Sequence, residues 1–176
     1  MRDALAALLP SDPRHAPPER TGDRPKGLNV LGTLAHHPQL ARAYHTFNGH
    51  ILFNTSLSPR QRELLVLRVA AVRECAYEWE QHVVLAGDVG LEPDEIDRIR
   101  TGADAPGWSP LDRAMLQAVD DLMASAEVGD TAWAVLAAEL DEHQLMDLIF
   151  TVGAYEVLAM ALKSFRVPLD DDLLRK

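Results

Sequence analysis

The sequence predicts an all-α fold of seven or eight helices, and three observations support this fold class. From Leu28 onward, apolar residues recur at steps of three and four, as at Leu28, Leu31 and Leu34, which is the period of a helix with one buried face. Residues typical of helix starts and stops recur along the chain. Segments that alternate apolar and polar residues, which would indicate strands, are nearly absent. A chain of 176 residues with 47% hydrophobic residues is long enough for one domain with a developed core.

Residues 1–27 are expected to form an extended N-terminal arm. Five of the eleven prolines lie between Pro10 and Pro25, mixed with charged residues. A segment of this composition cannot bury enough apolar surface to form a core of its own. The arm is therefore expected to lie on the surface or to wrap a neighbouring subunit, and a single all-helical domain is expected over residues 28–176.

The first helices of this domain follow from the apolar pattern and from one clear start signal. The pattern of Leu28–Leu34 continues over 40–52. The next helix begins at Ser58, which can cap it, with Pro59 at the first helical position and Gln61 completing a capping box.

A break is expected in the helix that starts at Pro59. A continuous helix through Ala86 would be about 42 Å long, which is long for a domain of this size, so the break is predicted near Arg73 to Cys75. It would place Cys75 at a helix N-terminus. There the helix dipole and the free N–H groups favour a thiolate.

The second half of the chain predicts four more helices. Gly90 ends the helix that contains Cys75 and His82, and Pro93 starts a short one that stops near Gly102. The later start signals are Ser109-Pro110, Asp130 before a helix over 131–140, and Asp141 before a helix that runs to about Phe165.

The chain also contains a short internal echo at a shift of 78 residues. Ala76-Tyr77-Glu78 recurs as Ala154-Tyr155-Glu156, each time inside an apolar helix. Gly153 stands at the place of Cys75 and Met160 at that of His82, so a weak internal duplication would have kept its chemistry in the first copy only.

Composition excludes several classes of partner. The net charge of -10 argues against a nucleic-acid backbone, which is bound by clustered Lys and Arg. No apolar run approaches the roughly 20 residues of a membrane span. One cysteine cannot form an internal disulfide, which fits a reducing cytoplasm. We therefore expect a cytoplasmic protein that acts on a small molecule.

Three chemically reactive side chains share one helical stripe. Cys75, Glu78 and His82 fall within roughly 60° of one another at about 100° per residue, so all three can face the same pocket. Neighbouring members are three and four residues apart, the spacings at which helical side chains touch. Glu78 is then the middle of any relay.

The segment from Leu57 to Ile96 resembles the carboxymuconolactone decarboxylase family, which includes the alkylhydroperoxidase D group. The residues that carry the resemblance are Arg62-Glu63, Leu67-Arg68, Cys75-Ala76-Tyr77-Glu78-Trp79 and His82. Alkylhydroperoxidase D enzymes have a second cysteine where this chain has Glu78, while decarboxylase-type relatives commonly have Glu there. The resemblance implies an alkylhydroperoxidase D-like helical bundle that assembles as a trimer or hexamer; a dimer stays open.

Two enzymatic chemistries fit these residues. In the first, Glu63, Glu78 and His82 form a proton-transfer set for decarboxylase- or lactone-type chemistry, Arg68 contacts the substrate carboxylate or enolate, Cys75 lines the pocket, and no metal or organic cofactor is needed. The alternative is a thiol-dependent peroxidase in which Cys75 is oxidised and an outside thiol restores it. A third possibility is an oligomer without catalytic activity, with an inert buried cysteine.

Overall fold

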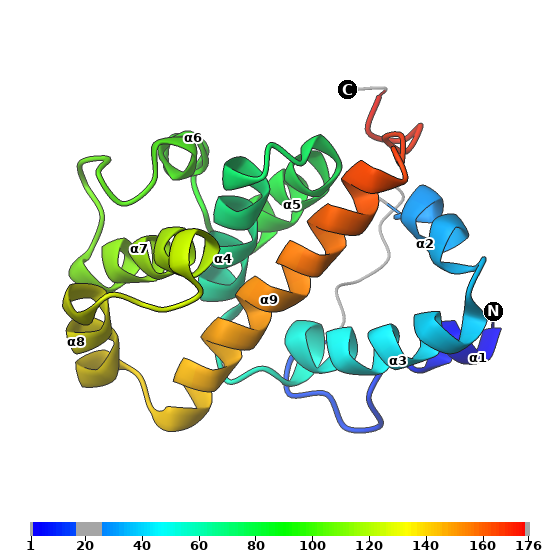
Figure 1. Cartoon of the computed structure of the whole chain (residues 1–176), viewed down its shortest axis with the longest axis horizontal. Helices are drawn as coiled ribbons and strands as arrows, with labels where there is room; N and C mark the ends of the chain where they lie inside the picture. Colours follow the sequence, from blue (N-terminus) through cyan, green and yellow to red (C-terminus); the bar gives the residue numbers. More distant parts are fainter. Residues whose placement is uncertain (1, 17–25, 175–176) are drawn as a thin grey trace.

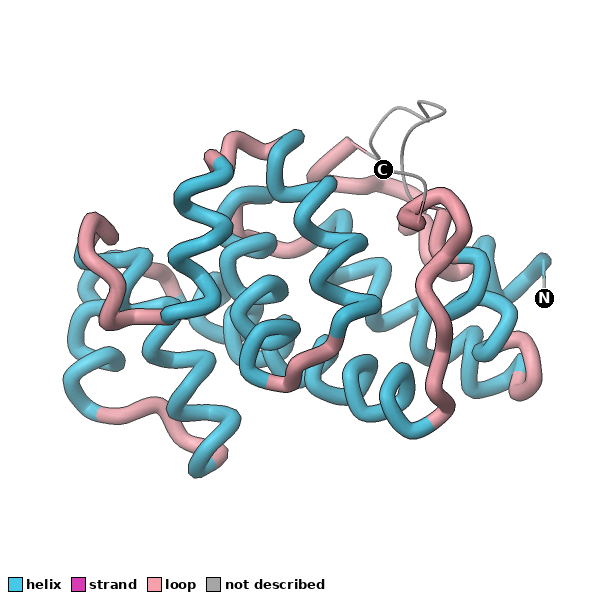
Figure 2. The backbone as a smooth tube through the Cα atoms, turned by 90° about the horizontal axis from the view of Figure 1, so that it is seen from above, coloured by secondary structure: helices cyan, strands magenta, loops and turns pink. Residues whose placement is uncertain are grey.

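A computed structural model describes residues 2–16 and 26–174 of the chain. Within these residues it has no strand and contains nine α-helices and one π-helical turn, and Figure 2 shows helices alternating with loops along the described backbone. The elements are α1 (Arg2–Ala6), α2 (Leu28–Leu34), α3 (Pro38–Gly49), η1 (His50–Asn54), α4 (Pro59–Val72), α5 (Ala76–Asp88), α6 (Pro93–Thr101), α7 (Pro110–Ser125), α8 (Asp130–Glu139) and α9 (Glu142–Ser164). The predicted all-α class is confirmed.

Helix α4 lies at the centre of the bundle. It contacts α5, α6, α7 and α9, and α9 crosses in front of it in Figure 1. Because neighbours surround α4, apolar residues cover nearly its whole circumference, with Leu64, Leu65, Val66 and Leu67 all buried. The charged residue Glu63 lies in the same buried run, so its carboxylate needs polar partners inside the core.

The predicted break between two helices is confirmed. Helix α4 ends at Val72, and Glu74 adopts a left-handed conformation with φ 50°. The amide of Glu74 donates to the carbonyl of Ala71, and the amide of Cys75 donates to that of Ala70 over 2.9 Å, which is the hydrogen-bond pattern of a Schellman motif. Cys75 is then the N-cap residue of α5. The chain turns at this point, so the reactive residues start a new helix.

Most other helix starts also agree with the sequence. Ser58 caps α4 and forms a capping box with Gln61, and Asp141 caps α9 in the same way. At α8 the boundary differs by one residue, because Gly129 is the N-cap and Asp130 is the first helical residue. At this position the carboxylate of Asp130 is still stabilised by the positive end of the helix dipole.

The described part of the N-terminal arm is partly helical. Helix α1 packs against α3, and Ala4 is buried there. At Gly49 of α3 a Cβ would collide with the carbonyl oxygen of Leu8, so the glycine permits this close approach. The sequence predicts an extended arm; a short apolar stretch at its start is enough to form one helix against α3. Residues 17–25 of the arm lie outside the described residues.

The C-terminal segment after α9 fastens α2 to α5. Asp170 is buried, and its carboxylate accepts hydrogen bonds from the Asn29 amide (2.8 Å), the Tyr77 hydroxyl (2.8 Å) and the Gln81 amide group (2.9 Å). Val167 and Leu169 of the same segment pack on the small apolar cluster that contains Cys75. The chain end therefore covers one side of the Cys75 region.

Candidate active site

The best-defined polar contact in the core joins α4 to α5. Nδ1 of His82 lies 2.6 Å from Oε2 of Glu63, which is fully buried. Arg62 donates from Nε and Nη2 to the other oxygen of Glu63, and from Nη1 to the carbonyl of Leu52. Burial opposes ionisation of Glu63, but His82 and Arg62 outweigh burial and lower its pKa below the ordinary value. An ionised Glu63 accepts the Nδ1 proton, which leaves Nε2 of His82 for proton exchange.

Glu78 is buried in a different state. Its side chain is 2% exposed, and apart from a contact with the Cys75 thiol neither carboxyl oxygen has a hydrogen-bond partner within the described residues. Burial raises its pKa to about 8; the contact with the Cys75 thiol opposes this shift, and the negative charge of Glu156 adds to it. At neutral pH Glu78 is therefore mostly a neutral acid that can deliver a proton.

Cys75 is a buried thiol and not the expected thiolate. Burial is the largest cause that raises its pKa to about 11, followed by the negative charge of Glu78. A backbone hydrogen bond from Glu78 in the first turn of α5 and the charge of Lys163 lower the pKa by less. The helix N-terminus acts in the direction expected from the sequence, but desolvation and Glu78 outweigh it, so the net shift does not give a thiolate.

Two tyrosines join this cluster without having been identified from the sequence. The ring of Tyr155 in α9 meets the His82 imidazole edge to face, with 5.0 Å between centroids. Burial, then the charge of Glu63, raises the pKa of Tyr155 well above its ordinary value. Burial, with a contribution from Glu78, also raises the pKa of Tyr44 in α3. The internal echo at Ala154-Tyr155-Glu156 was the one sequence signal that drew attention to Tyr155.

The structure does not bring Arg68 to this cluster. Its guanidinium binds the carboxylate of Asp120 through two nitrogens, at 2.7 and 2.9 Å. Its third nitrogen donates to the carbonyls of Ile99 and Arg100 at the end of α6. Through these bonds Arg68 holds α4, α6 and α7 together. The helix break turns the Cys75 stripe away from Arg68.

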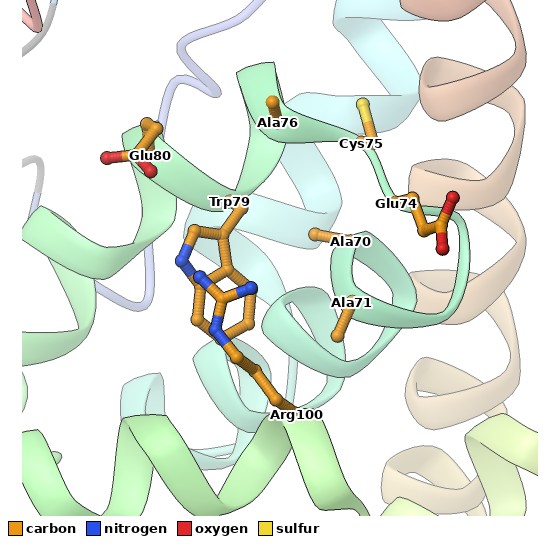
Figure 3. Close-up of a pocket in the computed structure, with 8 residues that line it drawn as sticks. All are labelled: Ala70, Ala71, Glu74, Cys75, Ala76, Trp79, Glu80 and Arg100. Atoms are coloured by element: carbon orange, nitrogen blue, oxygen red, sulfur yellow. The ribbon is translucent and has the colours of Figure 1, made fainter.

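A pocket of about 290 Å³ opens beside Cys75. It lies between the end of α4 and the start of α5, where the Arg100 guanidinium stacks 3.7 Å from the centroid of the Trp79 ring (Figure 3). The Cys75 sulfur points away from this stacked pair in Figure 3, toward the apolar cluster that Tyr77, Ala159 and Leu162 form with it. The pocket thus reaches the backbone around Cys75 more directly than its sulfur.

No group of three or more His, Cys, Asp or Glu side chains within the described ranges is arranged to hold a metal ion. Three histidines between residues 37 and 50 have other surroundings. His37 caps α3 by accepting from the Leu40 amide, and His50 binds Asp147 over 2.7 Å. His45 is buried, and burial lowers its pKa, so it is a neutral ring.

Comparisons with known proteins agree with this architecture. The model of the carboxymuconolactone decarboxylase family matches residues 38–121, a segment that contains Glu63, Cys75, Glu78 and His82. No curated protein matches the chain.

Several solved structures share the fold. A protein of unknown function from Agrobacterium tumefaciens, suggested to be the antioxidant defence protein AhpD, aligns with a TM-score of 0.72 and 22% identity over 78% of this chain and 94% of that one. A peroxidase-related protein from Ralstonia eutropha JMP134 with an alkylhydroperoxidase AhpD core has a TM-score of 0.72 and 22% identity, covering 82% of this chain and 78% of its own. The debrominase Bmp8 has a TM-score of 0.73 and 11% identity, over 98% of this chain and 87% of that one.

At these identities the structural likeness establishes the fold, which is that of the alkylhydroperoxidase D-like proteins. The family match adds the segment that carries the buried acids and the histidine. Residues 38–121, just under half of the chain, thus match the model of the carboxymuconolactone decarboxylase family, within an alkylhydroperoxidase D-like fold.

Proposed function

We propose that this protein is a small-molecule enzyme that transfers protons at carbon, in the decarboxylase or lactone class, with Glu78 as the acid and His82 as its partner. The observation that carries the proposal is the Glu78 carboxyl, which is 2% exposed and, apart from its contact with the Cys75 thiol, has no hydrogen-bond partner within the described residues. A buried carboxyl whose hydrogen bonds are incompletely satisfied costs stability. Its presence one turn from the charge-paired His82 is accounted for by a substrate that supplies the missing contact.

The side chains match the needs of a decarboxylation. When a carboxylated, electron-poor lactone loses carbon dioxide, the electron pair of the broken C–C bond enters the conjugated system and leaves a dienolate. This anion takes a proton at carbon, which Glu78 holds at neutral pH because its pKa is raised to about 8. His82, fixed through Nδ1 by Glu63, presents Nε2 as the second acid–base group. Glu63 orients the ring, so we regard it as a positioning residue.

Tyr155 supports this arrangement from α9. Its ring packs edge to face on His82, so the imidazole is held both by a carboxylate and by an aromatic wall. Arg68 is removed from the proposed substrate contacts, because Asp120 and two carbonyls occupy its donors.

The test compares three single variants with carboxylated unsaturated lactones and β-keto acids as substrates. Carbon dioxide release and deuterium uptake at the product carbon are measured in heavy water. We expect Glu78→Gln and His82→Ala each to lower kcat by roughly 10²–10⁴-fold, and Cys75→Ser to keep most of the turnover. Full activity of Glu78→Gln would contradict the proposal.

The second candidate function is a thiol peroxidase that uses Cys75. Its support is the position of Cys75 at the start of α5 beside Glu78, and the peroxidase-related description of the Ralstonia eutropha relative. In that cycle the ionised fraction of Glu78 accepts the thiol proton, the sulfur attacks the peroxide, and the O–O bond breaks. Glu78 then returns the proton to the leaving oxygen, which gives a sulfenic acid and an alcohol. Two external thiols then reduce the sulfenic acid and leave as a disulfide, with release of water.

The same three variants separate the two candidates. Hydroperoxide consumption with dithiothreitol as the reductant is lost in Cys75→Ser if the peroxidase is the true activity. Because burial and Glu78 raise the pKa of Cys75 to about 11, little of the thiol is ionised at pH 7. We therefore expect peroxide turnover by the wild type to be slow and to increase with pH.

A further inference from the structure

A second cavity, whose lining includes none of Glu63, Glu78 and His82, lies between α2, α3 and α9. Its volume is about 510 Å³, within the range of roughly 300–1,000 Å³ found for pockets that hold small molecules. Figure 1 shows α2 beside the C-terminal end of α9, with the start of α3 next to α2. Residues from these three helices and from the segment after α9 line the cavity, which we call the α2–α9 pocket.

The walls of the α2–α9 pocket are largely apolar. Val30 of α2 and Leu158 and Leu162 of α9 line it, and Leu162 is 3% exposed, so the pocket reaches into the interior. Leu40 and Phe165 also line it and are 56% and 70% exposed. Apolar surface therefore continues from the buried part of the pocket to its opening, which suits a ligand with an apolar chain.

The polar side chains of the lining gather on the α2–α3 side. They are Thr33, His36 and His37, and no acidic residue lines the pocket although the chain has 27 Asp and Glu residues. The Thr33 hydroxyl donates to a carbonyl of its own helix. Nδ1 of His37 accepts from the Leu40 amide, so the neutral ring carries its proton on Nε2 as a donor. This side of the pocket thus offers N–H donors and no carboxylate.

The start of α3 adds a favourable field for a negative charge. His37 is the N-cap of this twelve-residue helix, and Leu40 lies in its first turn; both line the pocket. The positive end of a helix dipole stabilises anions. The last carbonyls of α9 already accept hydrogen bonds from the amides of residues 165–167, so their lone pairs are partly engaged. An anionic group is therefore best placed beside the start of α3.

One layer of side chains separates this pocket from Cys75. Leu162 packs with Cys75 in the small apolar cluster and also lines the pocket. Val30, Leu158 and Val167 pack on the same cluster and line the pocket as well. A ligand in the pocket would therefore hold the side chains that cover Cys75.

From these features we infer that the α2–α9 pocket binds a small amphipathic molecule, whose apolar chain contacts Leu158 and Leu162 and whose terminal anionic group lies beside His36, His37 and the start of α3. This site is additional to the acid–base cluster and does not depend on the reaction proposed for it. A peptide segment is a poorer match, because its backbone N–H and C=O groups would enter an apolar pocket without partners.

A series of straight-chain carboxylates tests the size of the pocket. Isothermal titration calorimetry of the full chain uses hexanoate to tetradecanoate, each below its micelle concentration. We expect binding of one molecule per chain. The affinity should increase about fourfold with each added CH₂, since burying a CH₂ contributes about 0.8 kcal/mol, and should stop increasing once the chain fills the pocket. Absence of saturable binding, or an increase that continues to the longest chain as in surface adsorption, would overturn the inference.

A charge reversal at the opening tests where the anionic group lies. His36→Glu is expected to weaken decanoate binding by roughly fivefold and to strengthen binding of decyltrimethylammonium, which has the same chain and a cationic head. The matched control is His143→Glu, at an exposed histidine in the first turn of α9; it should leave both affinities unchanged. Wild-type protein that binds decyltrimethylammonium as tightly as decanoate would contradict the inferred head group.

Filling the pocket tests where the chain lies. Ala161 lines the pocket, and Ala161→Phe is expected to weaken decanoate binding by roughly tenfold or more. Ala138→Phe, at an exposed position of α8, is the control and should bind as the wild type does. Circular dichroism checks the helix content. If Ala161→Phe loses it, Thr33→Phe fills the same pocket from α2.

The single cysteine gives an independent measurement of the same site. Saturating decanoate is expected to slow alkylation of Cys75 by iodoacetamide severalfold in the wild type, because the ligand holds the side chains between the pocket and the thiol. The filled variant should show no such protection. Decanoate binding that persists in the filled variant, or wild-type labelling that decanoate leaves unchanged, would show that the ligand binds elsewhere and would overturn the inference.

Discussion

At the scale of single residues, burial raises the pKa of both Cys75 and Glu78. For Cys75 this effect outweighs the helix N-terminus, which lowers the pKa. The first turn of α5 offers Cys75 a backbone hydrogen bond and a positive dipole, which lower the pKa. Such helix-end effects are worth about 0.3–1 kcal/mol. Desolvation and the nearby carboxyl act in the opposite direction and leave a thiol with a pKa of about 11. Both groups are therefore mostly protonated at neutral pH, and the pair carries little negative charge.

This arrangement predicts a slow thiol. Cys75 is the one cysteine in the chain, so alkylation by iodoacetamide reports on it alone. At pH 7 we expect a rate roughly 100-fold below that of an ordinary cysteine. In Glu78→Gln the carboxylate is removed, so the pKa of Cys75 falls and the labelling profile moves to lower pH. Half-maximal labelling of the wild type at or below pH 8.5 would contradict the assignment.

Glu78 also predicts how stability depends on pH. Its folded pKa of about 8 lies above the ordinary value of 4.5, so the folded state binds a proton that the unfolded state releases. Its contribution to stability is complete below pH 4.5 and is lost as the pH rises toward 8. The free energy of unfolding of Glu78→Gln should therefore exceed that of the wild type increasingly between about pH 5 and pH 8, with a constant difference above that range. Urea titrations at several pH values measure this difference, and an equal slope in both proteins would exclude a buried acid at Glu78.

The sequence was informative about which residues matter and less so about their states. Periodicity correctly placed Glu78 and His82 on one helix, and the family spacing included Glu63. The partner of His82 is Glu63 from α4 and not Glu78, because that contact depends on how α4 and α5 pack. Tyr155 comes from a helix 73 residues later in the chain than His82, so no local pattern could pair them.

At the scale of elements, the break between α4 and α5 directs the site. A helix continuous from Pro59 would have kept Arg68 and Cys75 on one stripe. The Schellman motif at residues 70–75 instead turns the chain and frees α5 to place Glu78 and His82 against α4 and α9. Length alone predicted this break, because a helix of that size does not fit a small domain. The consequence for Arg68 needed the packing of α6 and α7, which sequence periodicity does not contain.

The motif predicts a stabilising substitution. Glu74 holds φ 50°, a left-handed conformation that costs a residue with a Cβ about 1–2 kcal/mol. Glu74→Gly removes this cost. Glycine also gives the unfolded chain more entropy, which offsets part of the gain, so the free energy of unfolding is expected to rise by up to about 1 kcal/mol. The control Glu80→Gly lies inside α5 and is expected to lower it by about 1 kcal/mol. Thermal or urea unfolding measures both, and loss of stability in Glu74→Gly would show that the side chain has another role.

At the scale of the whole molecule, the C-terminal segment joins distant parts of the chain. Asp170 accepts hydrogen bonds from α2 and from two positions on α5, and Val167 and Leu169 lie over the Cys75 cluster. The segment has no helical or strand periodicity that would have predicted its position, because its contacts depend on one buried carboxylate. The fold class and the helix order could be predicted from the sequence, while this long-range connection could not.

Replacing Asp170 is predicted to open this side of the molecule. Asp170→Ala leaves three donors without their carboxylate and is expected to lower the free energy of unfolding by about 2–3 kcal/mol. It should also make Cys75 label several times faster, since the segment no longer holds Val167 and Leu169 in place. Asp171→Asn is the control, because Asp171 is exposed and is expected to change neither quantity. Slower or unchanged labelling in Asp170→Ala would show that the segment does not cover Cys75.

Helix α9 holds the imidazole of His82 from the side opposite α4. The ring of Tyr155 packs edge to face on the imidazole, while Glu63 of α4 holds Nδ1. Because α9 runs unbroken from Glu142 to Ser164, the place of Tyr155 is set by the packing of the whole helix. A core substitution far along α9 is therefore expected to displace the imidazole without touching it.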